Sequence, residues 1–176
     1  VFHDVINLRH AKKAEAAGVD AIIGVGAGAG GHAGRITPYA LIPYLKQNLS
    51  VPVIAAGAIS TGKQIAASFA LGAELAYMGT RFISSDECGA PQPYKAMVVD
   101  AGPEDIVYTD QVSGVHANFL KASLPEGGQP TQDAKRWRDI WSAGHGVAEI
   151  TEITAIENIV ESVVREYHDA VAALPR

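Results

Sequence analysis

The stretch VPVIAAGAISTGKQIAASFALGAELAYMGTRF (residues 51–82) holds two apolar runs with a helix-like segment between them. The runs VPVIAAG (51–57) and LAYMGTRF (75–82) do not alternate between apolar and polar residues. The segment STGKQIAASFALG (60–72) starts with a serine and a threonine, either of which suits an N-cap, and it stops at a glycine. Non-alternating runs separated by helices are typical of a parallel sheet. This stretch therefore predicts a strand–helix–strand unit.

The same order of elements continues towards the N-terminus. AIIGVG (21–26) is a further apolar run that ends in glycines. Helices are predicted over residues 7–17, where Ala, Lys and Glu dominate and Gly18 follows, and around residues 39–47. The opening VFHDV (1–5) has the composition of a strand. We expect three strand–helix units preceded by an incomplete one.

Two α/β architectures fit these units: the second half of an eight-fold (β/α) barrel and an open doubly wound sheet. In either, the loops at the carboxyl ends of the strands carry the functional site. Glycines gather at these ends, so the site is expected at residues 26–34, 57–62 and 79–81. Residues 84–130 are proline-rich with little periodicity, which indicates an insertion or a lid rather than more barrel.

The last part of the chain predicts two helices, residues 132–141 and 154–174, on either side of SAGHG (142–146). Thr154 and Glu157 have the spacing of a capping box. Apolar residues of the last helix recur at helical spacing, and this stripe is expected to be a packing face. Its members are Ile156, Val160, Val163, Val164, Tyr167, Val171 and Leu174.

Composition excludes several classes of partner. The net charge of −5 comes from 14 basic and 19 acidic residues without a long run of either sign, which argues against nucleic acid and anionic membranes. One cysteine, Cys88, excludes an internal disulfide and suits a reducing compartment. No apolar run approaches the roughly 20 residues of a membrane span, and no signal-peptide pattern opens the chain. We expect a cytoplasmic protein that binds small molecules, and self-association into a homo-oligomer stays open.

Two successive loops have the composition of a phosphate cradle. Gly57 and Ala58 follow one predicted strand and lead into a helix, and Gly79 and Thr80 follow the next strand. Inward-pointing backbone N–H groups and a helix N-terminus both favour a bound phosphate. In barrel enzymes the phosphate often lies between the loops after strands seven and eight. The alternative, that these glycines only permit tight turns, remains open.

The stretch GVGAGAGGHAG (24–34) has six glycines and one ionisable residue, His32. So many glycines cost conformational entropy unless the backbone turns sharply or approaches something closely. A histidine can act as base, acid or hydrogen-bond donor near neutral pH, or it can make a local loop contact. His116 and His145 could also face the site if their segments fold over it. Asp86, Glu87 and Cys88 lack ligand spacing, so no metal is expected.

Four segments together carry a family resemblance. AGGHAG (29–34), VPVIAAGAI (51–59), LGAELAYMGTRF (71–82) and WSAGHG (141–146) resemble the nitronate monooxygenase family, formerly called 2-nitropropane dioxygenases. The resemblance covers nearly the whole chain. It implies an FMN-type (β/α)8 TIM barrel, with about strands five to eight present, that oxidises alkyl nitronates with dioxygen.

The resemblance also assigns residues. His32 matches the catalytic histidine, which takes a proton from the carbon next to a nitro group. Six positions match backbone that binds FMN: Gly30 and Gly31 beside the flavin, Gly57 and Ala58 in the first phosphate loop, and Gly79 and Thr80 in the second. The implied division of the chain is 1–83 as the barrel half with its phosphate loops, 84–130 as the insertion, and 131–176 as C-terminal helices packed on the barrel.

Three departures from the family pattern matter. Ala58 stands where the family has a second glycine, and His145 replaces a glutamine. The resemblance also begins at about the fifth barrel strand. Half a parallel barrel leaves strand edges and an apolar interior open to water. The chain is therefore expected to aggregate, to pair with another half or, as we favour, to be part of a longer enzyme.

Two other functions are compatible with the residues. Flavin-dependent enoyl-acyl-carrier-protein reductases have a similar fold and glycine–glycine–histidine segment, and would use NAD(P)H and a fatty-acyl substrate. WSAGHG (141–146) and the lack of an evident basic patch for a carrier protein favour the monooxygenase. A third candidate is a non-catalytic barrel fragment without a complete site.

Overall fold

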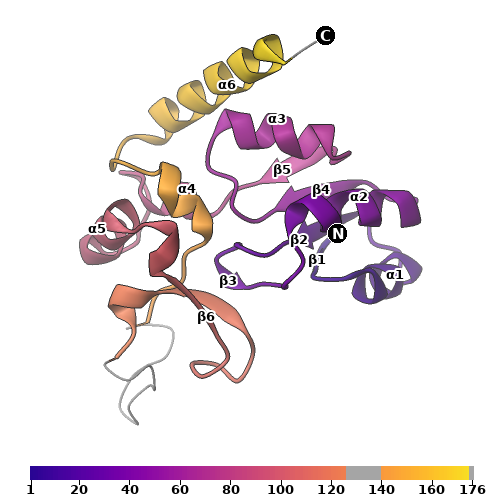
Figure 1. Ribbon diagram of the computed structural model, residues 1–176, viewed down its shortest axis with the longest axis horizontal. Helices are drawn as coiled ribbons and strands as arrows, with labels where there is room; N and C mark the ends of the chain where they lie inside the picture. The colour runs from indigo at the N-terminus through magenta and orange to yellow at the C-terminus, as the bar shows by residue number, and fades with distance from the viewer. Residues whose placement is uncertain (126–139, 175–176) are drawn as a thin grey trace.

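The computed structural model describes residues 1–125 and 140–174. A four-stranded parallel sheet forms its N-terminal half (Figure 1). The strand order is β1 (Phe2–Val5), β2 (Ala21–Val25), β4 (Val53–Ala56) and β5 (Leu75–Tyr77). Ile22 pairs with Val53, and Ile54 pairs with Leu75. The predicted parallel sheet is confirmed, and these four strands do not close into a barrel.

The helices between these strands begin where a polar side chain can accept a backbone N–H. α1 (Leu8–Ala16) follows Asn7, whose side chain accepts a hydrogen bond from the first turn at 2.9 Å. α3 (Gly62–Ala70) follows Thr61, which forms a capping box with Gln64. Sequence-local chemistry therefore determines both helix starts.

The helix ends are equally local. α1 is followed by Gly18 with φ +84°, and α3 is followed by Gly72 with φ +98°, a backbone conformation that favours glycine. α2 (Pro38–Asn48) begins with a proline, whose fixed φ suits the first helical turn. The three helices predicted in this region are confirmed, with ends displaced by at most two residues.

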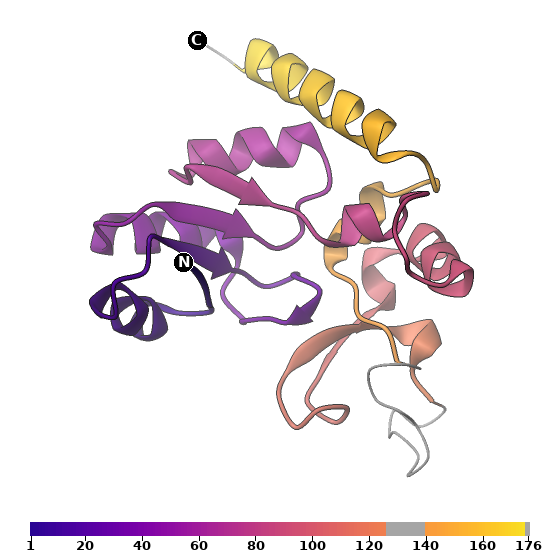
Figure 2. The ribbon, with the colours of Figure 1, turned by 180° about the vertical axis from the view of Figure 1, so that it is seen from behind.

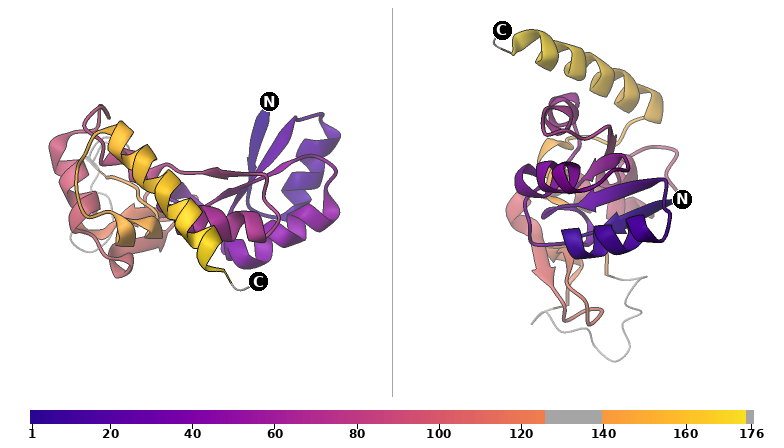
Figure 3. Two further views of the ribbon diagram at one scale, coloured as in Figure 1. Left: turned by 90° about the horizontal axis from the view of Figure 1, so that it is seen from above. Right: turned by 90° about the vertical axis from the view of Figure 1, so that its right-hand side faces the viewer.

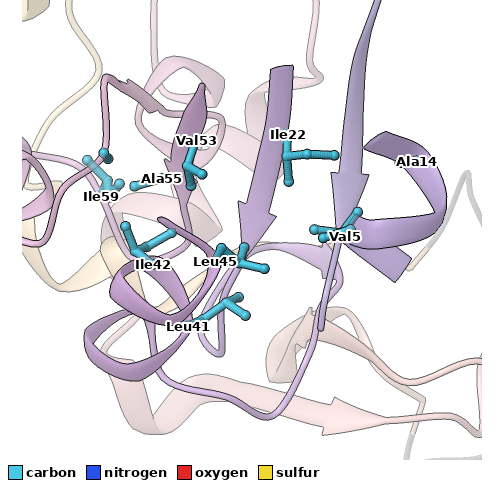
Figure 4. Close-up of a cluster of buried hydrophobic side chains, with 11 residues drawn as sticks. Val5, Ala14, Ile22, Leu41, Ile42, Leu45, Val53, Ala55 and Ile59 are labelled. Atoms are coloured by element: carbon cyan, nitrogen blue, oxygen red, sulfur yellow. The ribbon is translucent and has the colours of Figure 1, made fainter. Parts of the chain in front are cut away.

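The helices cover one face of the sheet. Ile22, Val53 and Ala55 point to the side on which Leu41, Ile42 and Leu45 of α2 complete a buried apolar cluster (Figure 4). The alternate strand residues point to the opposite face: Ala21, Ile23, Val25, Ile54 and Ala56. Ala29, Ala33 and Tyr108 cover that face in place of a helix. A doubly wound sheet has helices on both faces, so the arrangement is that of a part-barrel.

The third apolar run is a strand only in its first part. β5 ends at Tyr77, and Thr80 begins the short helix α4 (Thr80–Ile83). The prediction that Gly79 and Thr80 follow a strand is confirmed, and the helix that starts there was not predicted. Gly79 has φ −116° and ψ −61°, so the chain turns out of the sheet there.

Residues 84–130 contain regular structure that the sequence did not predict. α5 (Gln92–Asp100) is followed by the short helix η1 (Pro103–Asp105) and by an antiparallel hairpin of β6 (Ile106–Thr109) and β7 (Ala117–Leu120), and η2 (Lys121–Ser123) ends the run. The hairpin pairs with β3 (Gly31–His32), which places Gly31 opposite Asn118 and His32 opposite Ala117. Figure 2 shows this second lobe beside the parallel sheet. Whether it moves as a lid stays a prediction.

The C-terminal region has η3 (His145–Glu149) and the long helix α6 (Ile156–Ala173). The helix predicted over residues 132–141 lies outside the described residues except for Ile140 and Trp141, which are not helical. The predicted capping box at Thr154 was wrong, because Ala155 is the N-cap residue. The Glu87 carboxylate instead accepts the Ile156 N–H, at 3.0 and 3.1 Å from its two oxygens.

The apolar stripe of α6 packs only in part. Only Ile159 and Val163 are buried on this helix, while Val160 and Val164 stay 46% and 50% exposed. α6 lies diagonally over α3 (Figure 3), and a Cβ on Gly62 would come within 2.2 Å of the α6 backbone. The close approach of α3 at Gly62 selects the buried face, which shares Val163 with the predicted stripe and adds Ile159. Among the described residues, no helix is long and apolar enough to cross a membrane.

Candidate functional site at the strand ends

A cavity of about 510 Å³ opens at the carboxyl ends of the parallel strands. Strand ends, the glycine loop after β2, and residues from the second lobe line it together. Six of the seven residues assigned by resemblance line this cavity: Gly30, His32, Gly57, Ala58, Gly79 and Thr80. Gly31 is the seventh; it belongs to β3 and is not among the lining residues.

The loop after β2 is in direct backbone contact with the WSAGHG segment. A Cβ on Gly144 would lie 2.3 Å from the Gly28 carbonyl oxygen, and a Cβ on Gly30 would lie 2.9 Å from the Gly144 nitrogen. The His145 N–H donates to the Gly28 carbonyl at 2.9 Å, and this hydrogen bond holds the two segments together where they cross. These glycines are needed for two backbones to touch, so part of the glycine content serves packing within the protein.

The turn after β4 has an unusual backbone. Gly57 has φ +114°, and Ala58 has φ +54°, the one positive φ among non-glycine residues in the described part of the chain. Left-handed backbone costs a residue with a side chain roughly 1–2 kcal/mol. This cost is a physical reason why glycine would suit position 58 better than the alanine present. Within the described residues, no protein acceptor takes the N–H groups of Ala58 and Ile59. The turn therefore presents backbone donors at the cavity.

Three N–H groups at the N-terminus of α3, those of Ser60, Thr61 and Gly62, already have acceptors within the protein. The N–H groups of Ser60 and Thr61 both donate to the Gln64 side chain, at 2.6 and 3.0 Å. The Gly62 N–H donates to the Glu166 carboxylate at 2.9 Å. These three N–H groups are therefore used within the protein, and an anion in the cavity would depend mainly on donors of the preceding loop.

Two hydroxyl groups add to the donors of the cavity. Thr80 Oγ1 accepts the Gly144 N–H at 3.0 Å, which leaves its own proton to donate. Ser60 is 2% exposed and lines the cavity, and its hydroxyl has no hydrogen-bond partner in the described structure. A Cβ on Gly79 would meet nothing within 4 Å, so that position faces open space. Sequence reasoning named Thr80 and Gly79 but missed the role open to Ser60.

His32 lies at the edge of the cavity on β3. Its Nε2 is 3.5 Å from the hydroxyl oxygen of Ser113 in the β6–β7 loop. Next to it, the Asn118 side chain donates to the Ala29 carbonyl at 2.7 Å and ties β7 to the glycine loop. Ser113 and Asn118 carry no sequence signal, because they lie more than 80 residues from the groups they contact.

Tyr94 of α5 and Ser142 form another part of the cavity lining. The Tyr94 hydroxyl donates to the Ser142 carbonyl, and its ring stacks on Trp141 with centroids 4.9 Å apart. Burial raises the pKa of Tyr94 above its ordinary value of 10.0, against the opposing effect of the Ser142 hydrogen bond. Tyr94 therefore stays a neutral hydrogen-bond donor over the physiological range.

Other sequence candidates lie outside this cavity. His116 is in the β6–β7 loop, with Nε2 3.5 Å from Arg35 and Nδ1 3.9 Å from Asp110. His145 is not among the lining residues. No group of three or more His, Cys, Asp or Glu side chains in residues 1–125 and 140–174 could hold a metal ion.

Comparisons with known proteins point to one family. The family model described as nitronate monooxygenase matches residues 3–135 of the chain. The chain is 40% identical over 118 residues to a probable nitronate monooxygenase of Staphylococcus saprophyticus, an alignment that covers 61% of this chain and 33% of that relative. The chain thus spans about a third of the length of the curated relatives it matches.

Two solved structures share its fold. FabK from Thermotoga maritima superposes with a TM-score of 0.85 at 31% identity, covering 98% of this chain and 62% of that chain. A nitroalkane oxidase from Streptomyces ansochromogenes superposes with a TM-score of 0.83 at 28% identity, covering 99% of this chain and 59% of that chain. Almost every residue of this chain has a counterpart in a larger protein.

Proposed function

The chain belongs to the nitronate monooxygenase family, and we propose on that premise that it carries the flavin-binding and proton-transfer part of an enzyme that oxidises alkyl nitronates with dioxygen. The family and its structural neighbours are flavoenzymes, and FMN is the flavin we propose for this chain. The observation that carries the proposal is the presence of His32 in one cavity with the two glycine-bearing loops at Gly57 and Gly79.

The donors of the cavity fit a phosphorylated planar cofactor. Phosphate needs several donors that are not already used, and the N–H groups of Ala58 and Ile59 and the hydroxyls of Ser60 and Thr80 are four such groups. The open space at Gly79 leaves room for a phosphate between the two loops. We infer that these residues would hold the phosphate of FMN, while the backbone at Gly30 and Gly31 would lie beside its ring.

His32 is the proposed proton-transfer residue. FMN, when bound, supplies the oxidation–reduction chemistry. A neutral nitroalkane must first lose the proton on the carbon next to its nitro group, and a histidine at the edge of the cavity can accept that proton. A nitronate has already lost it. Loss of His32 should therefore affect nitroalkanes more than nitronates.

The remaining lining suits an alkyl chain. Ile23 and Val25 of β2, Ile59 after β4 and Ile83 of α4 give the cavity an apolar wall. Apolar walls favour burial of a hydrocarbon and keep water from the reacting carbon. A small nitroalkane or its nitronate combines an alkyl part with an anionic or polar head, and it is the substrate class that we propose.

The test compares two substrate forms in the flavin-loaded protein. His32→Ala should retain flavin absorbance and lower nitroalkane turnover by about 10²–10⁴-fold, the usual contribution of a general base, with a smaller effect on preformed nitronate. The exposed His168→Ala on α6 serves as the matched control and should leave both rates unchanged. Unchanged nitroalkane turnover in His32→Ala would remove His32 as the base, and a protein that binds no flavin would indicate a non-catalytic fragment.

A flavin-dependent enoyl-acyl-carrier-protein reductase is the second candidate. It is supported by the structural likeness to FabK, which is as high as the likeness to the nitroalkane oxidase. The two candidates differ in their electron donor, because the reductase needs NAD(P)H. Rapid anaerobic bleaching of the bound flavin by NADH or NADPH would favour the reductase, and bleaching by a nitronate alone favours the oxidation we propose.

A further inference from the structure

We propose that Thr80 couples the phosphate site to the loop that leads to His32. Its hydroxyl would donate to a bound phosphate while it accepts the Gly144 N–H, and Gly144 lies where its segment crosses the loop after β2. Towards His32, Thr80 is a positioning residue, because it acts through backbone contacts. The inference rests on the proposed phosphate site and adds that an occupied site stabilises the wall of the cavity that carries His32.

The hydrogen bond between Thr80 and Gly144 has a fixed direction. The Gly144 nitrogen lies 3.0 Å from Thr80 Oγ1, and a backbone N–H only donates, so the hydroxyl oxygen must accept. The hydroxyl proton then remains, and within the described residues no protein group accepts it. Thr80 lines the cavity, so an anion bound there is a suitable acceptor for this proton.

Gly144 passes a displacement on because its backbone is in contact with the loop after β2. A Cβ at Gly144 would lie 2.3 Å from the Gly28 carbonyl oxygen and 2.8 Å from the Gly30 nitrogen. The N–H of the next residue, His145, donates to the same Gly28 carbonyl at 2.9 Å. A shift of Gly144 towards or away from Thr80 would therefore shift this loop as well.

The loop after β2 continues into β3, which contains His32. The Asn118 side chain donates to the Ala29 carbonyl at 2.7 Å, and His32 pairs with Ala117 in the β3–β7 ladder. These contacts hold the loop and β3 to the same hairpin strand. The contact at Gly144 is thereby extended to the histidine through backbone pairing.

A bound anion would strengthen this series of hydrogen bonds. When a hydroxyl donates to a neighbour, its oxygen becomes a better acceptor, so hydrogen bonds in series reinforce one another. Hydrogen bonds to charged groups are also stronger than those between neutral groups. We therefore expect the Gly144 N–H to be held more firmly when a phosphate accepts the Thr80 proton.

Amide hydrogen exchange tests the coupling without a measurement of turnover. Inorganic phosphate is the probe, because it would fill the phosphate site and leave the place of the flavin ring empty. At constant ionic strength, saturating phosphate should slow exchange in residues 142–146 and 28–32 by about fivefold, since a hydrogen bond in series with a charged acceptor is strengthened. FMN should slow exchange in residues 142–146 by at least as much.

Two substitutions separate the hydroxyl from the shape of the side chain. Thr80→Val removes the hydroxyl and keeps the volume, so FMN should bind about tenfold more weakly, the equivalent of one hydrogen bond to a charged group. Saturating phosphate should then leave exchange in residues 28–32 unchanged. Thr80→Ser keeps the hydroxyl and should restore both effects. The matched control is Thr109→Val, outside the cavity lining, which removes a hydroxyl that accepts the Gln111 N–H at 3.2 Å and should change neither effect.

The outcomes separate this inference from the proposed function. If FMN binds but phosphate changes no exchange in residues 28–32, the coupling fails and the cofactor assignment stands. The same holds if Thr80→Val responds to phosphate as the native protein does. If neither FMN nor phosphate binds, the proposed cofactor site fails, and the coupling fails with it. The measurement on the native protein needs no substitution, so it decides the coupling even where Thr80→Val does not fold.

Discussion

The cavity has two walls that hold their shape by different means. The backbone wall, formed by Gly57, Ala58, Gly79 and Thr80, follows β4 and β5 and presents N–H groups. The side-chain wall, formed by His32, Tyr94 and Ser142, comes from three segments that are distant in the sequence. In the backbone wall, a substitution that enlarges a glycine is expected to disturb the site. In the side-chain wall, a substitution that removes a polar group or a ring is expected to disturb it. Substitutions can therefore disturb one wall at a time.

The two walls meet at Gly144, where the largest effect is expected. A Cβ there would lie 2.3 Å from the Gly28 carbonyl oxygen and 2.8 Å from the Gly30 nitrogen. Gly144→Ala should lower the free energy of unfolding by about 2–3 kcal/mol, because neither backbone segment can yield without breaking the crossing. Its φ of −96° suits alanine, so the effect reports the contact alone. Thermal or denaturant unfolding measures it.

Gly79→Ala is the matched control for that substitution. Its φ is −116° and its Cβ would meet nothing within 4 Å. Stability should stay within about 0.5 kcal/mol of the native value, as for other unstrained surface changes. Flavin binding should weaken, because the methyl group would extend into the proposed phosphate site. A large loss of stability in Gly79→Ala would contradict the distinction between the two positions.

A smaller effect is expected in the side-chain wall at Tyr94. Tyr94→Phe removes the hydrogen bond to the Ser142 carbonyl and keeps the stack on Trp141. The free energy of unfolding should fall by about 1 kcal/mol, the net value of one hydrogen bond, or somewhat more where the carbonyl stays buried. Tyr94→Leu, which also removes the stacked ring, should cost more. Equal losses in the two variants would mean that the hydroxyl carries the whole contribution.

The same residue predicts a pH dependence with a definite sign. Burial raises the pKa of Tyr94 in the folded protein, so the unfolded chain releases this proton first as the pH rises. The contribution is fully present below the ordinary pKa of 10.0 and is lost as the pH rises through the higher pKa of the folded state. Stability measured between pH 9 and 11 should fall less steeply in Tyr94→Phe than in the native protein.

The smallest effect is expected in the backbone wall at Ala58. Ala58→Gly relieves a left-handed conformation at φ +54°, but glycine also increases the entropy of the unfolded chain. The two terms largely cancel, so the free energy of unfolding should rise by less than about 1 kcal/mol. Flavin affinity should be retained, since the backbone N–H is unchanged. A loss of stability would mean that the Ala58 methyl group packs better than its backbone strain suggests.

Sequence reasoning succeeded where the determinant lies within a few residues. The α1 start at Asn7, the α3 N-cap, predicted as Ser60 or Thr61 and found at Thr61, and the glycines after both helices are local features. It failed where the partner is distant. Glu87 caps α6 from 69 residues away, and this contact displaced the predicted capping box. The two residues of β3 became a strand only because β7 pairs with them.

The candidate site divides in the same way. Its glycine loops and His32 could be predicted from the sequence, because apolar runs that end in glycines mark the strand ends. Ser60 and Tyr94 could not, since each acquires its role from a contact or a burial that no local pattern records. The orientation of α6 belongs with them, because the close approach at Gly62 decided which of its faces is buried.

By itself, the sequence determined the order of strands and helices in the parallel-sheet half, the end of the sheet at which the cavity opens, and the family. These depend on propensity, periodicity and chain order, which are properties of neighbouring residues. The tertiary structure alone decided that the helices cover one face of the sheet and that a hairpin serine reaches His32. It also decided that side chains take the N–H groups of Ser60, Thr61 and Gly62 at the start of α3. The physical reason is that hydrogen-bond partners and buried faces are chosen by whatever the folded chain brings within contact distance.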